Sequence, residues 1–338
     1  MAATRSHRWQ RTLSRAFELA GVGLHSGVPV RVRVHPATVN TGVVFRTQQQ
    51  QHELRALISR VDDCKSQLCT QLTSVDGLTN ISTVEHLMAA LTVARVSNAY
   101  VDVDVVTAKT TPAAVELPIL DGSSLPFLDA IEDAGVHEQS DDGTDGETSL
   151  RYYRVKRPVQ VLLDDKAAWL LPMPETLGGS VRTPMLNMSV QVNFEHKGLG
   201  TKFCRFILGD DPEVNMKTFR EEIAPARTFT FEEEIAWMRA NGLALGGSLD
   251  NAVVFSDASS SAADSQASLA IRVLNPQGLR FAEDEWARHK LLDCIGDIGL
   301  AGLPLHGYFF ATSPGHALTR KLLRELLSDT ANFDEVRL

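Results

Sequence analysis

Apolar and polar residues alternate along two segments in the first third of the chain. Residues 28–34 read Val-Pro-Val-Arg-Val-Arg-Val, and residues 100–106 read Tyr-Val-Asp-Val-Asp-Val-Val. A period of two is typical of half-exposed strands. Between them apolar residues recur at helical spacing, so we predict a helix over 82–95, and a further helix over 125–134 follows a turn. The pattern indicates strands that are covered by helices on one face.

The second half of the chain repeats this combination of elements. We predict strands at 153–163, 181–194 and 306–312. We predict helices at 232–239, 282–300 and 317–327. Strands with packed helices in each half are typical of the α+β class, which is the fold class that we predict.

Composition alone predicts a boundary between two domains. Residues 138–149 are acidic, Gly-rich and free of apolar side chains, as linkers are. A chain of 338 residues is also long for a single core. We therefore predict a first α+β domain at 1–137, a linker at 138–150 and a second α+β domain at 151–338. A Ser/Ala-rich insertion near 257–268 interrupts the second domain.

Composition excludes several classes of function. Apolar residues make up 43% and charged residues 22% of the chain, as in ordinary soluble domains. A net charge of −9 argues against a nucleic-acid partner, and no apolar run is long enough to span a bilayer, so membrane contact is at most peripheral. The four cysteines lack Cys-x-x-Cys spacing and are too few for a disulfide scaffold, which favours a reducing compartment.

The first residues leave two interpretations of the compartment. Arg5, Arg8, Arg11 and Arg15 precede the first acidic residue, Glu18, which resembles the composition of a transit peptide. The sequence shows no secretory apolar segment. We expect a cytoplasmic protein of bacterial type, and a mitochondrial or other organellar protein is the alternative.

His289 and Asp293 are the first candidates for chemistry. They lie four residues apart in the predicted 282–300 helix, so their side chains point from one face. An imidazole and a carboxylate at this spacing are what a helix offers a divalent metal. Asp297 extends the polar stripe by one more turn. Because the spacing is common, a further ligand from another element is needed.

That further ligand is predicted at the start of the first helix. Ser82 followed by Glu85 matches a capping box, which by itself accounts for Glu85. His86 in the first turn is expected to stay neutral, and a neutral imidazole binds metal. Two histidines and one carboxylate leave one tetrahedral position open, as in catalytic zinc sites, and Glu85 is then placed as a general base. His316, just after a predicted turn, is either a capping or surface histidine or a catalytic one.

Several motifs occur together and in a fixed order along the chain. They are 21–27 (Gly-Val-Gly-Leu-His-Ser-Gly), 82–91, 118–123 (Pro-Ile-Leu-Asp-Gly-Ser), 226–229 (Ala-Arg-Thr-Phe), 246–251 (Gly-Gly-Ser-Leu-Asp-Asn), 288–297 and 315–318 (Gly-His-Ala-Leu). This ordered set closely resembles the UDP-3-O-acyl-N-acetylglucosamine deacetylases, a family of zinc enzymes. The resemblance extends from about residue 10 to about residue 327.

The resemblance implies a fold, a metal and a substrate. The fold is two similar α+β domains, each a sheet packed with helices, with the helices sandwiched between the two sheets. Zinc is bound at the domain interface by His86, His289 and Asp293, and iron(II) suits the same ligands. The substrate is UDP-3-O-(3-hydroxyacyl)-N-acetylglucosamine, an acylated UDP-sugar whose acetamide is hydrolysed to acetate and a free amine in the committed step of lipid A biosynthesis. We expect a monomer.

The family's catalytic roles fall on four residues of this chain. The resemblance implies Glu85 as general base and His316 as the group that stabilises the oxyanion or protonates the leaving amine. It implies that the Thr228 hydroxyl donates a hydrogen bond to the oxyanion. Asp297 matches the position that orients His316 and favours its charged form.

The nucleotide end of the substrate is implied to contact three further residues. Lys290 is placed at the diphosphate, and Phe194 and Phe229 near the uridine or sugar; a solvated helix lysine and core aromatics are the alternatives. Asn193 stands where the family commonly has Asp, and Ser313 where it often has a basic residue. These two departures leave open a zinc deacetylase of a different acylated sugar nucleotide. A non-catalytic metal- or nucleotide-binding relative that kept the fold is a separate alternative.

Overall fold

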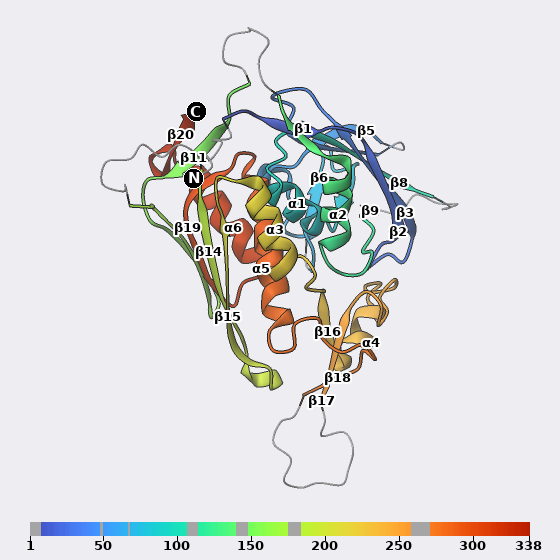
Figure 1. Cartoon of the computed structure of the whole chain (residues 1–338). Helices are drawn as coiled ribbons and strands as arrows, with labels where there is room; N and C mark the ends of the chain where they lie inside the picture. Colours follow the sequence, from blue (N-terminus) through green and yellow to red (C-terminus); the bar gives the residue numbers. More distant parts are fainter. Residues whose placement is uncertain are drawn as a thin grey trace, which may run out of the picture.

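The protein has two sheets as its outer layers and most of its helices between them (Figure 1). The structure is a computed structural model, and it describes residues 8–47, 50–66, 68–106, 114–139, 148–174, 184–257 and 271–338. The predicted α+β fold, with helices sandwiched between two sheets, is confirmed.

The sheet of the first half follows the alternation in the sequence. Its strands run in the order β2 (Phe17–Val22), β3 (Pro29–Pro36), β8 (Ala99–Val105), β4 (Val43–Thr47) and β5 (Gln50–Arg55). In β3 the side chains of Val30 and Val32 are buried, whereas Arg31 and Arg33 are exposed. Successive residues of a strand point to opposite faces, so one face of the sheet is apolar and packs on the helices.

Shorter elements complete the first half. A small sheet consists of β6 (Gln71–Thr73), β7 (Asn80–Ser82) and β9 (Val115–Glu116). A two-stranded pair consists of β1 (Arg11–Leu13) and β10 (Val136–Glu138). The small sheet matters for the site, because it places the chain just before β6 against the start of the first helix.

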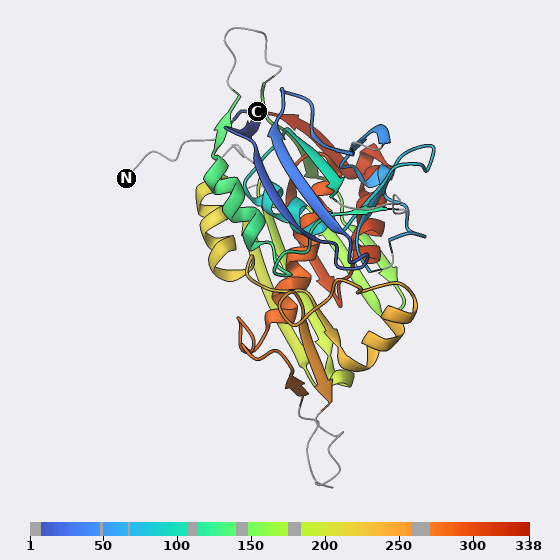
Figure 2. The same cartoon turned by 90° about the vertical axis from the view of Figure 1, so that its right-hand side faces the viewer.

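The sheet of the second half is larger. Its main run of strands is β12 (Val159–Leu163), β13 (Lys166–Leu171), β19 (Leu305–Thr312), β14 (Leu186–Phe194) and β15 (Gly200–Leu208), and β11 (Arg151–Val155) links β19 to β20 (Phe333–Arg337). A separate unit projects from one end of the molecule (Figures 1 and 2). It consists of β16 (Phe229–Phe231), β17 (Val253–Asp257), β18 (Ile271–Val273) and α4 (Glu232–Ala240).

Helices of both halves meet in the middle of the molecule. The helices between the sheets are α1 (Glu85–Val93), α2 (Leu125–Ala134), α3 (Pro212–Glu222), α5 (Glu285–Ile298) and α6 (His316–Ser328). Among them α1 and α5 make the most extensive contact. Figure 2 looks from the right-hand side of Figure 1, and the sheet of the first half (blue) lies in front of the central helices.

Gly296 allows the close approach of α1 and α5. A Cβ atom added at Gly296 would lie only 2.1 Å from the carbonyl oxygen of Glu85. An interior helix glycine costs about 0.5–1 kcal/mol relative to alanine, so intrinsic propensity does not favour glycine here. The glycine instead lets the backbones of the two helices touch where the candidate site residues begin.

Replacing Gly296 by Ala is expected to lower the free energy of unfolding by about 1–3 kcal/mol, because the added methyl group overpacks the helix contact. Urea denaturation monitored by circular dichroism measures this change. Gly209→Ala is the matched control, since a Cβ there meets only Asn215 Oδ1 at 3.5 Å, an ordinary contact. Equal stability of the two variants would contradict the close-approach explanation.

Two predictions about local structure are wrong. The capping box is not formed, because Ser82 belongs to β7, and Thr83 turns the chain with a positive φ of 58° before α1 begins at Glu85. The single strand expected over 153–163 is two strands, β11 and β12, that pair with different neighbours. Pro158 lies in the break, and a proline has no N–H for a sheet ladder.

Part of the predicted domain organisation falls outside the described residues. This applies to 140–147 of the linker and to 258–270, which include nearly all of the predicted insertion. The described ends of the latter segment, Asp257 and Ile271, pair across β17 and β18. The boundaries at 1–137 and 151–338 stay a prediction. Of the helices in the described parts of the chain, none has the length and apolar character that crossing a membrane requires.

Candidate metal centre and active site

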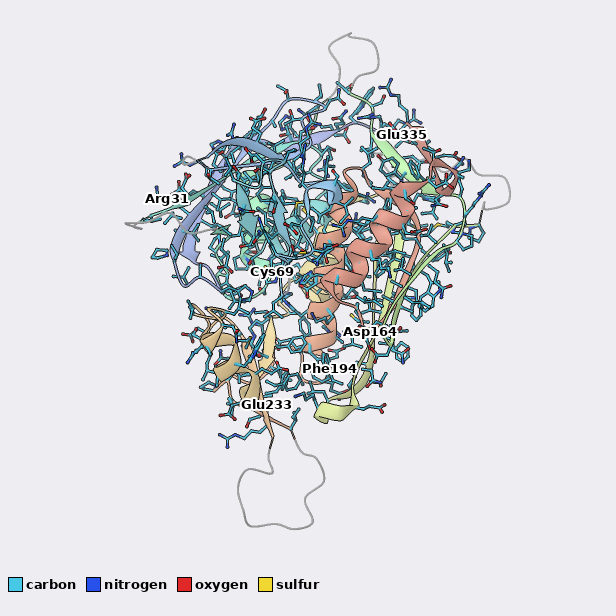
Figure 3. The ribbon with its side chains drawn as sticks, turned by 180° about the vertical axis from the view of Figure 1, so that it is seen from behind. Arg31, Cys69, Asp164, Phe194, Glu233 and Glu335 are labelled. Carbon is cyan, nitrogen blue, oxygen red and sulfur yellow. The ribbon has the colours of Figure 1, made fainter. Side chains whose placement is uncertain are left out.

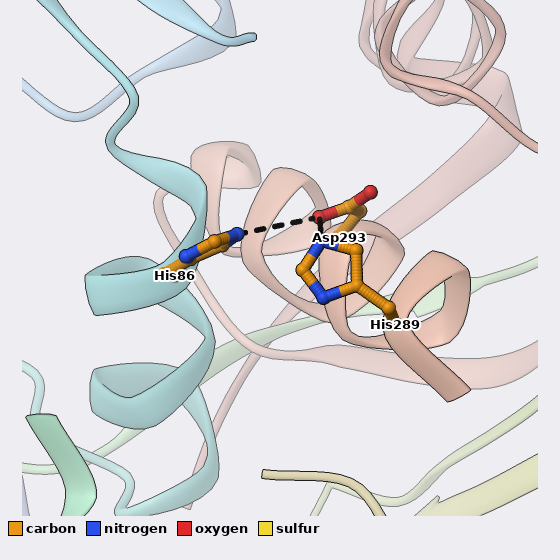
Figure 4. Close-up of side chains that lie close together, drawn as sticks. All are labelled: His86, His289 and Asp293. Carbon is orange, nitrogen blue, oxygen red and sulfur yellow. Dashed lines mark ion pairs between the residues drawn. The ribbon is translucent and has the colours of Figure 1, made fainter. Parts of the chain in front are cut away.

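Three side chains from the two halves of the chain converge between α1 and α5. His86 comes from the first turn of α1, and His289 and Asp293 come from successive turns of α5 (Figure 4). The Oδ1 atom of Asp293 lies 3.9 Å from His86 Nε2 and 3.5 Å from His289 Nε2. All three residues are buried, and one ligand atom from each lies within 4.8 Å of the others.

The protonation states of these side chains suit a divalent cation. Burial, together with the neighbouring His289, lowers the pKa of His86 to about 3, and burial also lowers the pKa of His289. His289 Nδ1 donates to the carbonyl of Ala226 at 3.0 Å, which leaves the lone pair on Nε2. Burial alone would raise the pKa of Asp293, but the adjacent histidines and Lys290 outweigh it and lower this pKa. Two neutral imidazoles and a carboxylate form a donor set that zinc accepts.

Glu85 lies next to this group as the first residue of α1. Its side chain is buried, its Oε2 accepts the backbone N–H of Thr70 at 3.1 Å, and its Oε1 lies 3.7 Å from His316 Nε2. Burial raises the pKa of Glu85 to about 7; His316 opposes the shift and two nearby aspartates add to it. A carboxylate with a pKa near neutrality is suited to accepting and releasing a proton.

His316 faces Glu85 from the first position of α6. Its Nδ1 donates to Asp297 Oδ2 at 2.8 Å, and its Nε2 lies 3.8 Å from Asp293 Oδ2. Burial would lower the pKa of His316, but Asp297, Asp293 and Glu85 outweigh burial and raise it to about 9. The imidazole is therefore cationic at neutral pH. With 9% of its side chain exposed, His316 is not the surface histidine that was one alternative.

A cleft of about 710 Å³ opens beside these residues and extends to α4 and β16. This volume lies within the range of small-molecule sites. Every site residue predicted from the sequence lines the cleft except Asp297, which lies behind His316. Figure 3 shows Cys69 near the centre of the molecule and Phe194 and Glu233 toward the projecting end.

The cleft carries an aromatic wall next to the metal-ligand candidates. The rings of Phe194 and Phe229 meet edge to face at 5.7 Å, and the ring of Phe229 lies 6.4 Å from that of His289. Lys290 Nζ lies 5.7 Å from the centroid of the Phe229 ring and donates to Asp293 Oδ2 at 3.2 Å. Burial would lower the pKa of Lys290, but Asp293 outweighs it and raises this pKa. Lys290 is thus a partner of Asp293 and not a solvated helix lysine.

Thr228 and the two departures from the family pattern lie in different surroundings. Thr228 lines the cleft, and its N–H donates to the Gly122 carbonyl of the first half at 2.8 Å. Asn193 is exposed, and its side chain accepts the N–H of Glu195 at 2.9 Å. Ser313 occupies a turn with a positive φ of 48°. Neither Asn193 nor Ser313 is among the described residues that line the cleft.

Two residues of this region were assigned no role from the sequence. His25 lines the cleft, and its N–H and that of Ser26 donate to Glu116 at 2.9 and 2.8 Å. The Gly-rich motif at 21–27 was a signal for His25. Thr70 touches both Glu85 and Asp297, which are 15 and 227 residues away in the sequence. Contacts at such separations leave no local pattern, so Thr70 carried no signal.

The arrangement defines a class of protein. Two imidazoles and a carboxylate, flanked by a proton-accepting Glu85 and a cationic His316, are what mononuclear metal-dependent hydrolases use. Within that class, residues 10–328 match the family described as UDP-3-O-acyl N-acetylglycosamine deacetylase, and the chain belongs to this family. The family predicted from the ordered motifs is confirmed.

Proteins named UDP-3-O-acyl-N-acetylglucosamine deacetylase are similar to the chain over nearly its whole length. That of Tolumonas auensis is 38% identical over 329 residues, which cover 97% of this chain and 92% of the relative. That of Histophilus somni is 37% identical with the same coverage. That of Shewanella oneidensis is 36% identical over 321 residues, which cover 95% of this chain and 90% of the relative.

Proposed function

We propose that this chain hydrolyses the acetamide of UDP-3-O-(3-hydroxyacyl)-N-acetylglucosamine to acetate and the free amine, the committed step of lipid A biosynthesis. The observation that carries the proposal is the pairing of Glu85 with His316, 3.7 Å apart, beside a buried group that could hold a metal. A site that only bound a metal or a nucleotide would need neither residue. Membership of the deacetylase family supports the same reaction.

We propose zinc as the cation, held by His86, His289 and Asp293, and iron(II) suits the same donors. When bound, the cation supplies Lewis-acid chemistry, polarising the amide carbonyl and lowering the pKa of water. Because the ligands come from both α1 and α5, the helix contact at Gly296 sets their spacing.

The protein's own groups move the protons of the reaction. Glu85 accepts a proton from the water whose oxygen attacks the acetamide carbonyl carbon, and general-base catalysis of this kind contributes about 10²–10⁴-fold. His316 stabilises the oxyanion that forms and gives its Nε2 proton to the amine nitrogen as the C–N bond breaks. Asp297 holds His316 through Nδ1. The Thr228 hydroxyl, at the edge of the cleft, donates to the oxyanion.

The rest of the cleft is proposed to hold the nucleotide and sugar. Lys290 pairs with the diphosphate, and Phe194 and Phe229 pack against the sugar or uridine. Asn193 and Ser313 lie outside the described lining, so no observation favours a different sugar nucleotide. We propose a cytoplasmic site of action, which agrees with four cysteines that form no disulfide.

Purified zinc-loaded chain is expected to release one acetate for each amine product from UDP-3-O-(3-hydroxyacyl)-N-acetylglucosamine. Mass spectrometry of the nucleotide product and an enzymatic acetate assay measure both. UDP-N-acetylglucosamine, which lacks the acyl chain, is the control substrate and is expected to react more slowly. Loss of the acyl chain in place of the acetyl group, or no acetate from folded, metal-loaded chain, would refute the proposal.

A further inference from the structure

Thr70 lies behind the two groups that are proposed to move protons. It is fully buried and immediately precedes β6. Its backbone N–H donates to Glu85 Oε2 at 3.1 Å, and its hydroxyl donates to Asp297 Oδ1 at 2.6 Å. One residue therefore bonds to the proposed base and to the carboxylate that holds the proposed acid.

The direction of the hydroxyl bond follows from the donors around Asp297. His316 Nδ1 donates to Asp297 Oδ2 at 2.8 Å, so each oxygen of this carboxylate accepts one donor. Thr70 Oγ1 also lies 3.4 Å from His316 Nδ1, but that nitrogen's proton is already committed to Asp297. With two donors on two oxygens, the carboxylate cannot rotate without losing a buried hydrogen bond.

Thr70 is itself fixed by α6, the helix that begins at His316. Arg320 of α6 donates to Thr70 Oγ1 at 3.5 Å, to the Ser66 carbonyl at 3.0 Å and to Asp63 at 3.0 Å. Arg320 is 1% exposed. Hydrogen bonds from Arg320 thus tie Asp63, Ser66 and Thr70 to α6.

We propose that Thr70 is a positioning residue for deacetylation that sets the placement of Glu85 and, through Asp297, of His316; this inference rests on the proposed function. Thr70 is not among the described residues that line the cleft, so it is not expected to contact the substrate. Its hydroxyl holds Asp297 so that His316 keeps its Nδ1 bond and turns Nε2 toward Glu85. Its N–H holds Glu85 by the oxygen that does not face His316.

The test compares Thr70→Val, which removes the hydroxyl but keeps the N–H and the shape, with Thr70→Ser, which keeps both donors. Residues that hydrogen-bond to the ligands or acid–base groups of a site typically contribute about 10–100-fold to activity. We therefore expect kcat for acetate release to fall by about this factor in Thr70→Val. KM is expected to stay within about threefold, because the substrate is not contacted. Thr70→Ser is expected to restore kcat.

Thr79→Val is the matched control. Thr79 is also fully buried and directly precedes β7, but its hydroxyl has no hydrogen-bond partner among the described residues, so its removal is expected to leave kcat unchanged. In an Asp297→Asn background, Thr70→Val is expected to cause little further loss, because the hydroxyl acts through Asp297. All rates are expressed per folded, zinc-loaded chain, from thermal unfolding and metal analysis.

The positioning role would be overturned if Thr70→Val kept wild-type kcat, or if Thr70→Ser lost as much kcat as Thr70→Val. It would also be overturned if Thr70→Val lowered kcat by its full factor in the Asp297→Asn background. If Thr70→Val does not fold, Thr70→Cys, which has a weaker donor of similar size, is judged by the same criteria. A wild-type chain that releases no acetate would refute the proposed function itself. An active wild type with an equally active Thr70→Val would refute only the role of Thr70.

Discussion

Glu85→Gln is expected to lower kcat for acetate release by about 10²-fold or more, because an amide cannot accept the proton of the attacking water. The substitution keeps the shape of the side chain and an oxygen that accepts the Thr70 N–H. It leaves His86, His289 and Asp293 in place, so zinc content is expected to stay unchanged. Steady-state kinetics with metal analysis of the same sample measures both quantities.

The stability of Glu85→Gln gives an independent check. Burial raises the pKa of Glu85 from 4.5 to about 7, so ionising this carboxyl in the folded chain costs free energy that the unfolded chain does not pay. This cost grows as the pH rises from 4.5 to about 7. The neutral amide avoids the cost, so the variant is expected to be at least as stable as the wild type above neutral pH.

Glu335→Gln serves as a control, because Glu335 pairs with Arg151 between β11 and β20, away from the cleft. Its kcat is expected to equal that of the wild type. If Glu85→Gln kept wild-type kcat while it bound zinc and remained folded, Glu85 would not be the base.

His86→Ala is expected to remove bound zinc and, with it, activity. His86 supplies one of the three candidate ligand atoms that the described residues bring together, and it is the one that comes from α1. Removing a residue that only hydrogen-bonds to a metal ligand typically lowers activity by about 10–100-fold. Removing a ligand itself should lower activity further, so we expect a fall of about 10²-fold or more. The imidazole is neutral, since its pKa is about 3, and its removal leaves no unpaired charge.

Zinc per chain after gel filtration, measured by mass spectrometry, and kcat in the presence of added zinc test this prediction. His137→Ala is the control, because His137 is exposed, contacts Ser14 and is not among the described residues that line the cleft. Full zinc content and full activity in His86→Ala would exclude His86 as a ligand. The same result in both variants would show that the effect is not specific to the site.

The sequence alone predicted those parts of the site that depend on spacing within one helix. His289 and Asp293 share a face of α5, and Asp297 lies one turn further on, as their four-residue intervals require. The helix that carries Glu85 and His86 is correctly predicted, but the capping box on which the prediction partly rests does not form. A capping pattern cannot distinguish a helix start from a strand that ends at a left-handed residue.

The remaining features depend on contacts between distant segments. The Ala226 carbonyl orients His289 from 63 residues away, and Thr70 reaches Asp297 over 227 residues. From the sequence, Gly296 is only a residue of low helix propensity. Its role follows from the structure, where the backbone of Glu85 packs against it. Such contacts follow from the packing of the two halves, which no local period in the sequence encodes.

The most direct test of the central claim is a zinc titration of metal-free chain with acetate release from UDP-3-O-(3-hydroxyacyl)-N-acetylglucosamine as the readout. Activity is expected to be negligible without the metal and to rise to a plateau at one zinc per chain, because the described residues contain one group of two histidines and one aspartate that could hold the ion. Full activity of the metal-free chain, or no acetate from folded chain that carries one zinc, would contradict the central claim.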